Sequence, residues 1–498
     1  MKTERSSGIL LHPTSFPGKY GIGTLGKEAF HFIDFLSKSK QKLWQILPLG
    51  PTGFADSPYQ CFSSSAGNPL LIDLETLANE GLLTNKEVAR MDIFSNGPVD
   101  FGKVIRKKYP LLRKAMKTFT KKPGKEIQKE FREFKTKQKS WLDDYCLFMS
   151  LKEHFKQRPW YQWEKPLKMR KETAIRPFRT LLKEQIEFHR FIQFLFFRQW
   201  LAVKEYAHQK NIRIIGDIPL YVALDSVDAW ANSEIFQFDA EKNPIVVGGV
   251  PPDYFSETGQ LWGNPLYRWD VLHKDRYRWW IDRIKSNLVL YDIIRIDHFR
   301  GFAAYWAVPY GEKTAVNGKW IPCPGKSLFE QIRKELGEIP IIAEDLGVMT
   351  DDVEELRDSF GLPGMKILQF AFDSSEANDY LPHNFIKNCV AYTGTHDNDT
   401  VKGWFDKAKP EDRKYVLDYL DSKGKKICRD FIRLVWASVA DIAIIPMQDL
   451  LELGSEARMN LPGTTLNNWL WRAKNRDFSD ERAQQLAELT KLYGRANK

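Results

Sequence analysis

Short apolar runs that end in polar or acidic residues recur along the chain, and segments with helical spacing lie between several of them. IRIIGDIPLYV, LVLYDIIRIDHFRGF, IPIIAEDLG and CVAYTGTHDND are of this kind, as are KLWQILPLG, NPLLIDLE, MKILQFAFD and DIAIIPMQDL. Buried strands that alternate with helices are typical of a parallel sheet. About eight such units predict an α/β fold, a (β/α)₈ barrel with its active site at the C-terminal ends of the strands, while an open doubly wound sheet is the alternative.

Helical segments and two insertions complete this pattern. TDDVEELRDSFG opens with a capping signal at Thr350 and ends at Gly361. Residues 76–200 do not fit the alternation and predict a mostly helical insertion, rich in aromatic residues and lysine, between the second and third strands. Residues 223–275 predict a loop insertion that acts as a lid. We therefore expect a single barrel domain over residues 1–498 that carries both insertions.

The composition permits a large core and restricts the class of protein. The chain has 498 residues, of which 43% are hydrophobic and 13% aromatic. No apolar run has the length of a membrane span, and the first residues, MKTERSSGILLHPTS, lack the pattern of a signal peptide. The five cysteines lie far apart without any CxxC, which argues against a disulfide framework or a zinc site. We expect a cytoplasmic protein with no membrane partner.

The net charge of +10 would suit an acidic partner such as nucleic acid. Much of the excess lies in KVIRKKYPLLRKAMKTFTKKPGKEIQKEFREFKTKQK, where Lys and Arg alternate with apolar residues at helical spacing. No nucleic-acid motif accompanies the charge. The favoured interpretation is therefore a solvated helical surface.

The stretch GIGTLG matches the G-x-G-x-x-G spacing of dinucleotide sites. That motif requires a strand directly before it. Here it follows HPTSFPGKY, whose two prolines and glycine predict a loop. We do not expect a nucleotide site.

Three carboxylates, Asp297, Glu344 and Asp397, are predicted to end three strands and to converge on one mouth of the barrel. Arg295 lies two residues before Asp297, so both project to one face, and a guanidinium there favours the ionised carboxylate that a nucleophile needs. Glu344 follows the apolar run IPIIA, which predicts a raised pKa and the role of general acid. Each acid alone could equally be part of a structural ion pair.

Two histidines strengthen the case for a sugar site, since His298 and His396 each adjoin an acid and offer ring N–H donors to a hydroxyl. In retaining glycoside chemistry one carboxylate attacks the anomeric carbon and a second, roughly 5 Å away, protonates the leaving oxygen. A third can stabilise positive charge on the sugar ring. The rival is a Ca²⁺ or Mg²⁺ site of Asp397, Asn398 and Asp399, which is disfavoured because the rest of an EF-hand loop is missing.

The segments IIRIDHFRGF, IIAEDLG and THDNDT resemble the active-site segments of the 4-α-glucanotransferases. These enzymes, also called amylomaltases or disproportionating enzymes, form glycoside hydrolase family 77 of the α-amylase clan. SGILLHPTSFPGKYGIGTLG, DSPYQCFSSSAGNPLLIDL, GDIPLYV, GGVPPDYFSETGQLWGNPLY and the RMNLPGT–NNW region resemble the family too. The resemblance spans nearly the whole chain and is weakest from about residue 85 to 190. Asp217 is followed by IPLYV without the His of most α-amylases, which agrees with this family.

The resemblance implies a role for each matching residue. Asp297 would be the nucleophile, Glu344 the general acid/base and Asp397 the transition-state stabiliser. The implied substrate-binding residues are Ser57 and Tyr59 on the acceptor side, Asp217, Arg295, His298 and His396 around the donor sugar, Tyr254, Phe255, Gln260 and Trp262 in a loop over the cleft, and Asp253 and Asp373. The family has no essential cofactor or metal, and it lacks the β-domain that follows the barrel in amylases.

The implied activity is the transfer of α-1,4-glucan segments between maltooligosaccharides or starch- and glycogen-type glucans. We expect glucan donors and acceptors as partners, no nucleic acid, and a monomer or simple homo-oligomer. A transferase must hold an incoming sugar hydroxyl and exclude water, and the aromatic residues of PPDYFSETGQLWGNPLY suit that task. The alternatives are an α-1,4-glucan hydrolase of the same clan, a non-catalytic glucan-binding protein and a basic nucleic-acid binder.

Overall fold

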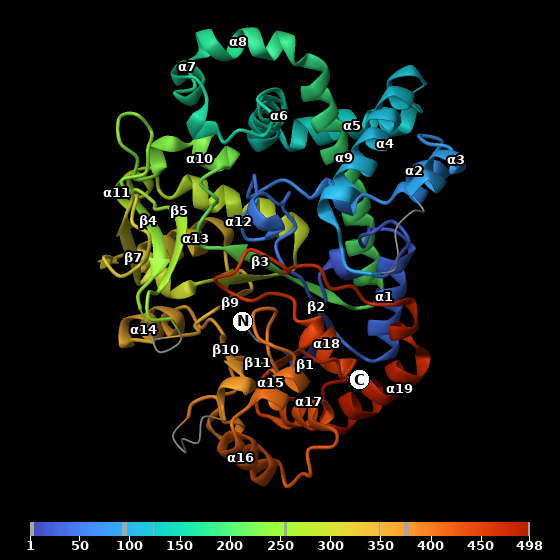
Figure 1. Cartoon of the computed structure of the whole chain (residues 1–498), viewed down its shortest axis with the longest axis vertical. Helices are drawn as coiled ribbons and strands as arrows, with labels where there is room; N and C mark the ends of the chain where they lie inside the picture. Colours follow the sequence, from blue (N-terminus) through green and yellow to red (C-terminus); the bar gives the residue numbers. More distant parts are fainter. Residues whose placement is uncertain are drawn as a thin grey trace.

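Eight parallel strands form a barrel at the centre of the molecule (Figure 1). The computed structural model describes residues 4–91, 97–122, 124–252, 256–347, 349–372 and 378–496. In the order in which they pair, the barrel strands are β10 (Gly364–Ile367), β11 (Cys389–Tyr392), β12 (Ile442–Pro446), β1 (Ser6–Leu10), β2 (Leu43–Gln45), β3 (Arg213–Pro219), β6 (Ile293–Asp297) and β9 (Ile341–Ala343). The predicted (β/α)₈ barrel is confirmed.

The barrel closes between β9 and β10 by side-chain and loop contacts in place of a regular ladder. The Ala343 main-chain N–H donates to the Pro363 carbonyl at 3.0 Å. The carboxylate of Asp345, just after β9, accepts the Met365 N–H of β10 at 2.7 Å and also pairs with Arg357. A Cβ on Gly364 would lie 2.1 Å from the Asp345 carboxylate, so glycine leaves the space that this side chain fills.

One predicted strand is wrong, and another was missed. NPLLIDLE forms a short 3₁₀ helix, Pro69–Leu71, followed by α2 (Leu74–Asn79). The Asn68 side chain accepts the Leu70 N–H and Asp73 caps α2, so local polar contacts turn the chain although the leucines are fully buried. The strand that was not predicted is β1, SSGIL, which pairs with β2 on one edge and with β12 on the other.

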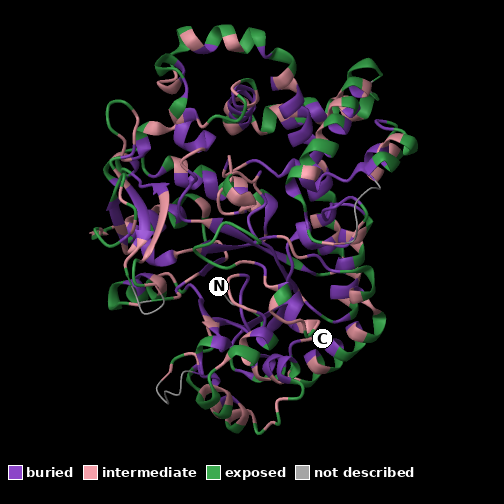
Figure 2. Cartoon of the chain, viewed as in Figure 1, coloured by how far each residue is buried: buried purple, intermediate pink, exposed green. Residues whose placement is uncertain are grey.

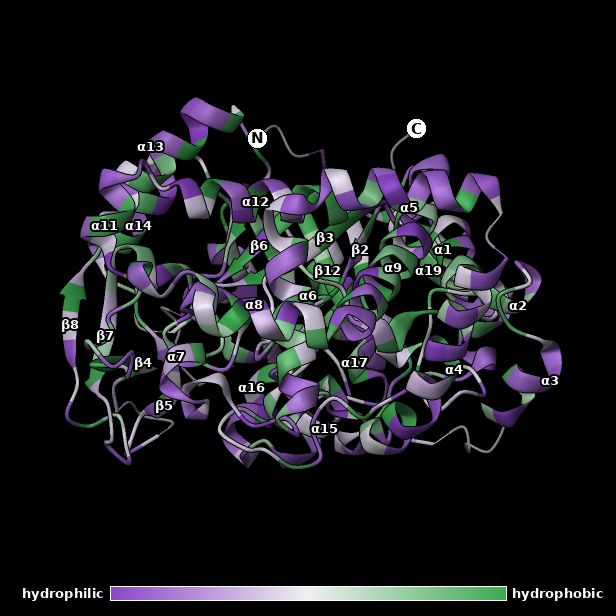
Figure 3. Cartoon of the chain, turned by 90° about the horizontal axis from the view of Figure 1, so that it is seen from above, coloured by the Kyte–Doolittle hydropathy of each residue, from purple (hydrophilic) through white to green (hydrophobic). Residues whose placement is uncertain are grey.

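Alternation along the strands divides the core into two layers. In β6, Ile293 belongs to the cluster inside the barrel, with Met365, Val390 and Ile442 among others, whereas Ile294 and Ile296 pack outward against helices. Arg295 and Asp297 therefore face the barrel interior. Figures 2 and 3 show buried, apolar ribbon concentrated in the strands and exposed, polar ribbon on the outer helices.

Between α2 and β3 the described chain is made mostly of helices. After α2 these are α3 (Asn85–Val88), α4 (Phe101–Lys121), α5 (Lys125–Lys137), α6 (Lys139–His154), α7 (Lys165–Lys168), α8 (Glu172–Leu181) and α9 (Lys183–Gln209). The long helix α9 contacts α6 in this region and α1 and β3 of the barrel, so it joins the two (Figure 1). The basic segment forms α4 and α5, and most of its lysines are exposed.

A second, antiparallel sheet lies at one side of the barrel (Figure 3). Its order is β5 (Gln260–Pro265), β4 (Val246–Val250), β7 (Ala304–Pro309) and β8 (Lys319–Pro322). Gln260 and Trp262, which we expected in a loop, are therefore strand residues. The loop prediction failed there because main-chain pairing with β4 orders a segment whose glycine and prolines suggested a turn.

The remaining helices surround the barrel. They are α1 (Lys27–Lys38), α10 (Val227–Ala231), α11 (Trp269–Lys274), α12 (Arg278–Leu290), α13 (Gly325–Leu336), α14 (Asp351–Ser359), α15 (Val401–Lys407), α16 (Pro410–Leu420), α17 (Ile427–Ala437), α18 (Met447–Leu450) and α19 (Asp480–Leu492). GIGTLG lies in the irregular segment before α1, as predicted. Within the described residues, no helix has the length and apolar character needed to cross a membrane.

Candidate active site

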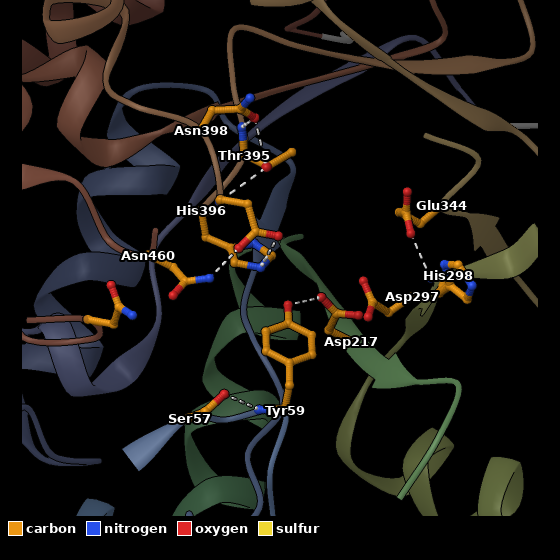
Figure 4. A network of polar contacts seen from close by, with 12 residues as sticks. Ser57, Tyr59, Asp217, Asp297, His298, Glu344, Thr395, His396, Asn398 and Asn460 are labelled. Atoms are coloured by element: carbon orange, nitrogen blue, oxygen red, sulfur yellow. Dashed lines mark hydrogen bonds and ion pairs between the residues drawn. The ribbon is translucent and has the colours of Figure 1, made fainter. Parts of the chain in front are cut away.

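Asp217, Asp297 and Glu344 lie close to one another at the C-terminal ends of barrel strands (Figure 4). Asp217 stands within β3, Asp297 is the last residue of β6, and Glu344 directly follows β9. Asp397 lies in the segment after β11. Because parallel strands end at the same face of the barrel, these side chains share one mouth.

Arg295 holds two of the carboxylates together. Its Nη1 lies 2.8 and 2.7 Å from the two oxygens of Asp217 and 3.0 Å from Asp297 Oδ1. The Arg295 and Asp217 side chains are 3% and 0% exposed, whereas that of Asp297 is 30% exposed. The buried Asp217 thus holds the guanidinium of Arg295 in place. Of the three side chains, Asp297 is the one that a ligand in the mouth can reach.

Burial raises the pKa of Asp297 well above its ordinary value, against the lowering effect of Arg295, and Asp217, Glu344 and Asp397 raise it further. Arg295 thus acts on Asp297 in the predicted direction, but burial outweighs its effect on the pKa. The side chain faces the open mouth, yet the surrounding protein excludes much of the water that would stabilise its charge.

Burial also raises the pKa of Glu344, as its apolar approach predicted, and Arg295 opposes the rise. Its carboxyl group is held by two main-chain donors, His298 N–H at 2.6 Å from Oε2 and Leu346 N–H at 2.9 Å from Oε1. His298 adopts a left-handed conformation, with φ of 54°, and this turn aims its N–H at Glu344. The orientation of Glu344 is thus fixed before any ligand binds.

Aromatic rings line both sides of the mouth. The Trp262 ring meets the His298 ring edge to face, with centroids 4.7 Å apart. On the other side, Tyr59 stacks on His396 at 5.2 Å with 13° between the planes, and its hydroxyl donates to Asp217 Oδ2 at 2.8 Å. The Ser57 hydroxyl accepts the Tyr59 N–H at 3.2 Å and shapes this loop. Flat rings beside carboxylates are the surfaces on which sugar rings pack.

The two aspartates of THDNDT have different surroundings. Asp397 is 43% exposed, and its Oδ1 accepts from Asn460 Nδ2 at 2.6 Å. Asp399 is 8% exposed, and its Oδ2 accepts from both Lys407 Nζ and the Ser455 hydroxyl at 2.7 Å. Asp399 therefore ties α15 to the chain after β12, whereas Asp397 keeps an open face.

The metal interpretation finds no support in these contacts. In the described parts of the chain, no group of three or more His, Cys, Asp or Glu side chains could hold a metal ion. Asn398, the third member of the candidate set, uses its side-chain oxygen to accept from the main chain and hydroxyl of Thr395. It closes a turn of the protein with that oxygen.

The sequence model of the family described as 4-alpha-glucanotransferase, glycoside hydrolase family 77, matches residues 11–477. The chain belongs to this family. A 4-alpha-glucanotransferase of Clostridium butyricum is 51% identical over 97% of this chain and 100% of its own length. That of Thermus thermophilus is 49% identical, over 98% of this chain and 99% of the relative. The solved amylomaltase of Streptococcus agalactiae, in complex with acarbose, is 42% identical with a TM-score of 0.96, and the match covers 99% and 100% of the two chains.

Within the family framework, not every predicted substrate-binding residue can be placed. Asp253, Tyr254, Phe255 and Asp373 lie outside the described residues. Gln260 and Trp262 lie side by side on β5, where Trp262 Nε1 donates to Gln260 Oε1 at 3.2 Å. The structure thus brings Trp262 and His298 together at one rim and Tyr59 and His396 at the other.

Two residues of the site were not identified from the sequence as candidates. Asn460 donates to the Asp397 carboxylate, and Arg458 donates to the Asp397 carbonyl at 2.5 Å and to the Asn460 carbonyl at 2.7 Å. Both belong to RMNLPGT, a segment in which the family resemblance was recognised but no individual residue was assigned a role. Nothing in its spacing indicated that it returns to the barrel mouth.

Proposed function

We propose that this family member transfers α-1,4-linked glucan segments between maltooligosaccharides by a retaining double displacement. The observation that carries the proposal is the pairing at the mouth of an accessible carboxylate beside a buried arginine with a second carboxyl group of fixed orientation and raised pKa. These are the two functions that retaining chemistry requires.

In the first half-reaction, Asp297 attacks C1 of the donor sugar and the bond from C1 to the leaving O4 breaks. Glu344 gives its proton to that O4, so the step requires Glu344 to be protonated while Asp297 is ionised. Arg295 favours this distribution because it lies 3.0 Å from Asp297 Oδ1. The product is a glycosyl-enzyme ester and a shortened glucan with a free 4-hydroxyl.

In the second half-reaction, the 4-hydroxyl of an acceptor glucan gives its proton to Glu344, and its oxygen attacks C1. The ester bond to Asp297 breaks, and the carboxylate is restored. Asp397 is partly exposed and uses Oδ1 to accept from Asn460. Its carboxylate stabilises the positive charge of the sugar ring in both transition states. His298, His396, Tyr59 and Trp262 hold the sugars on either side.

Incubation with maltotriose tests the proposal. Transfer yields glucose together with longer oligomers, and the total number of reducing ends stays constant. A steady rise in reducing ends without longer products would replace the transferase with a hydrolase of the same clan. A fluorinated glucosyl donor that slows the second half-reaction should leave a covalent adduct on Asp297, which peptide mass spectrometry locates.

The other expectations remain predictions. A cytoplasmic location, a role in starch, glycogen or maltose metabolism, and a monomeric or simple homo-oligomeric state are compatible with the family. Fractionation of cells and the mass of the purified protein in solution would test the first and the last of these.

A further inference from the structure

A small cavity lies beside His396. Its volume is about 20 Å³, and its walls include His12, Ser15, Thr395, His396, Gln448 and Met459. His12 and Ser15 belong to the segment just after β1, and Gln448 lies in α18 just after β12. Chain segments that are remote in sequence therefore meet around it.

Three polar atoms on residues of this wall lack partners. His12 Nδ1, Ser15 Oγ and His396 Nδ1 are fully buried and have no hydrogen bond to any described residue. The three residues are 6%, 1% and 5% exposed. A buried polar atom that makes no hydrogen bond destabilises the folded protein, so three such atoms in one place indicate a shared partner.

The size of the cavity and its three polar atoms fit a single water molecule. A volume of about 20 Å³ accommodates a single water molecule, for which roughly 10–15 Å³ suffices. Burial, together with the neighbouring His396, lowers the pKa of His12 to about 3, and burial also lowers the pKa of His396, so both rings are neutral at pH 7. Each neutral ring has one nitrogen that accepts.

The orientation of His396 decides which nitrogen that is. Its Nε2 lies 3.4 Å from Asp397 Oδ2, so the ring hydrogen belongs on Nε2 and Nδ1 is the acceptor. A water in the cavity can donate one hydrogen to His396 Nδ1 and the other to His12 Nδ1. It can accept the Ser15 hydroxyl hydrogen at the same time. All three buried atoms are then satisfied, with three hydrogen bonds to one water.

We propose that this cavity is a binding site for one structural water, and that His12 and Ser15 are positioning residues that act on His396 through it. The water fixes the Nε2–H tautomer, which lets His396 direct its N–H to a sugar hydroxyl or to Asp397 in the mouth. This part of the inference rests on the role of His396 proposed above. His12 and Ser15 touch neither the substrate nor the reacting atoms.

The test compares two buried hydroxyls. Ser15→Ala removes one partner of the water, and Ser6→Ala is its matched control, because Ser6 Oγ is also buried without a described partner but lies at the opposite end of β1. We expect Ser15→Ala to lower kcat about tenfold with little change in KM, and Ser6→Ala to change kcat less than twofold. Equal effects in the two variants would overturn the positioning role.

The tautomer gives a readout that does not depend on activity. With ¹⁵N-labelled histidine, long-range ¹H–¹⁵N spectra should show His396 as the Nε2–H tautomer in the natural protein and as a mixture in His12→Phe. A crystal structure at high resolution should show one water within hydrogen-bond distance of the three atoms. A dry cavity, or an unchanged tautomer in both His12→Phe and Ser15→Ala, would overturn the proposal. A changed tautomer with full turnover would support the water site and overturn the proposed role of His396.

Discussion

Each end of the barrel buries an arginine, and the two arginines have different partners. At the C-terminal end of the strands, Arg295 contacts the carboxylates of Asp217 and Asp297. At the N-terminal end, Arg495 is 0% exposed, and its hydrogen bonds within the described chain go to main-chain carbonyls. Those carbonyls belong to Ser6, Val435, Trp436, Ser438, Ala440 and Asp441. Val435 and Trp436 lie in the last turn of α17, where the helix dipole is negative, and Ser438, Ala440 and Asp441 follow it.

The difference shows how one type of side chain can serve function or stability. Around Arg495 the hydrogen-bond partners are main-chain carbonyls fixed by the fold, and a carbonyl does not take up a proton. Around Arg295 the partners are ionisable, and one of them, Asp297, remains accessible. A buried cation that leaves carboxylates reachable creates reactivity, whereas one surrounded by carbonyls joins segments of the chain.

The largest effect should come from removing the accessible partner of Arg295. We expect Asp297→Asn to lower the rate of maltotriose disproportionation on the order of 10⁴-fold or more, because no nucleophile remains. The free energy of unfolding should stay the same or rise, since the amide carries no buried charge. Initial rates and urea denaturation measure the two quantities. Retained turnover in a folded variant would show that the chemistry takes place elsewhere.

The next largest effect on kcat should distinguish Asp397 from Asp399. Asp397→Asn should cost on the order of 10³-fold in kcat, because the open carboxylate faces the charged transition state. Asp399→Asn should change kcat less than tenfold but lower the free energy of unfolding by about 1–3 kcal/mol, because Lys407 and Ser455 lose a charged partner. Comparable losses of kcat in the two variants would contradict the distinction drawn from their exposure.

At the opposite end, Arg495→Met should affect stability alone. We expect the free energy of unfolding to fall by about 3 kcal/mol or more, since several buried carbonyls lose their donor. The kcat of the folded variant should equal that of the natural protein at a temperature well below its Tm. Denaturant titration, with kcat corrected for the folded fraction, measures both. A specific loss of kcat would mean that the two ends of the barrel are coupled.

Asp449 is a buried acid near the same mouth that has no arginine partner in the described chain. Asp449 is 1% exposed and accepts from the Thr393 hydroxyl and the Val401 N–H, and burial raises its pKa to about 6. The folded state therefore binds this proton more tightly than the unfolded chain. Its contribution to stability is fully present below about pH 4 and is lost, by about 3 kcal/mol, as the pH rises through 6.

Asp449→Asn should remove this pH dependence. The free energies of unfolding of the variant and the natural protein, measured by denaturation at pH 4.5 and pH 7, should diverge in favour of the variant at the higher pH. The same difference at both pH values would show that Asp449 is ionised in the folded protein.

Strand ends were predictable from the sequence because a buried strand followed by an acid is a local pattern, as in IIRID and IIAED. NPLLIDLE was mistaken for a strand because a short, fully buried run has no period that separates it from a turn of helix. The net pKa direction of Asp297 depends on the whole surrounding protein, and a neighbouring arginine in the sequence does not reveal it. Asn460 reaches Asp397 through a segment of irregular path, for which no spacing rule exists.

The pairing of β1 with β12 has a consequence for the order in which the molecule is made. On the ribosome, β1 emerges before the other barrel strands, and one of its hydrogen-bonding edges has no partner until β12 has been made. Arg5 and Arg495 then meet the same carbonyls of Trp436, Ser438 and Ala440, which joins the earliest and latest parts of the described chain. During synthesis this free edge of β1 could therefore pair with the wrong strand, and the nascent protein must avoid such pairing until β12 is available.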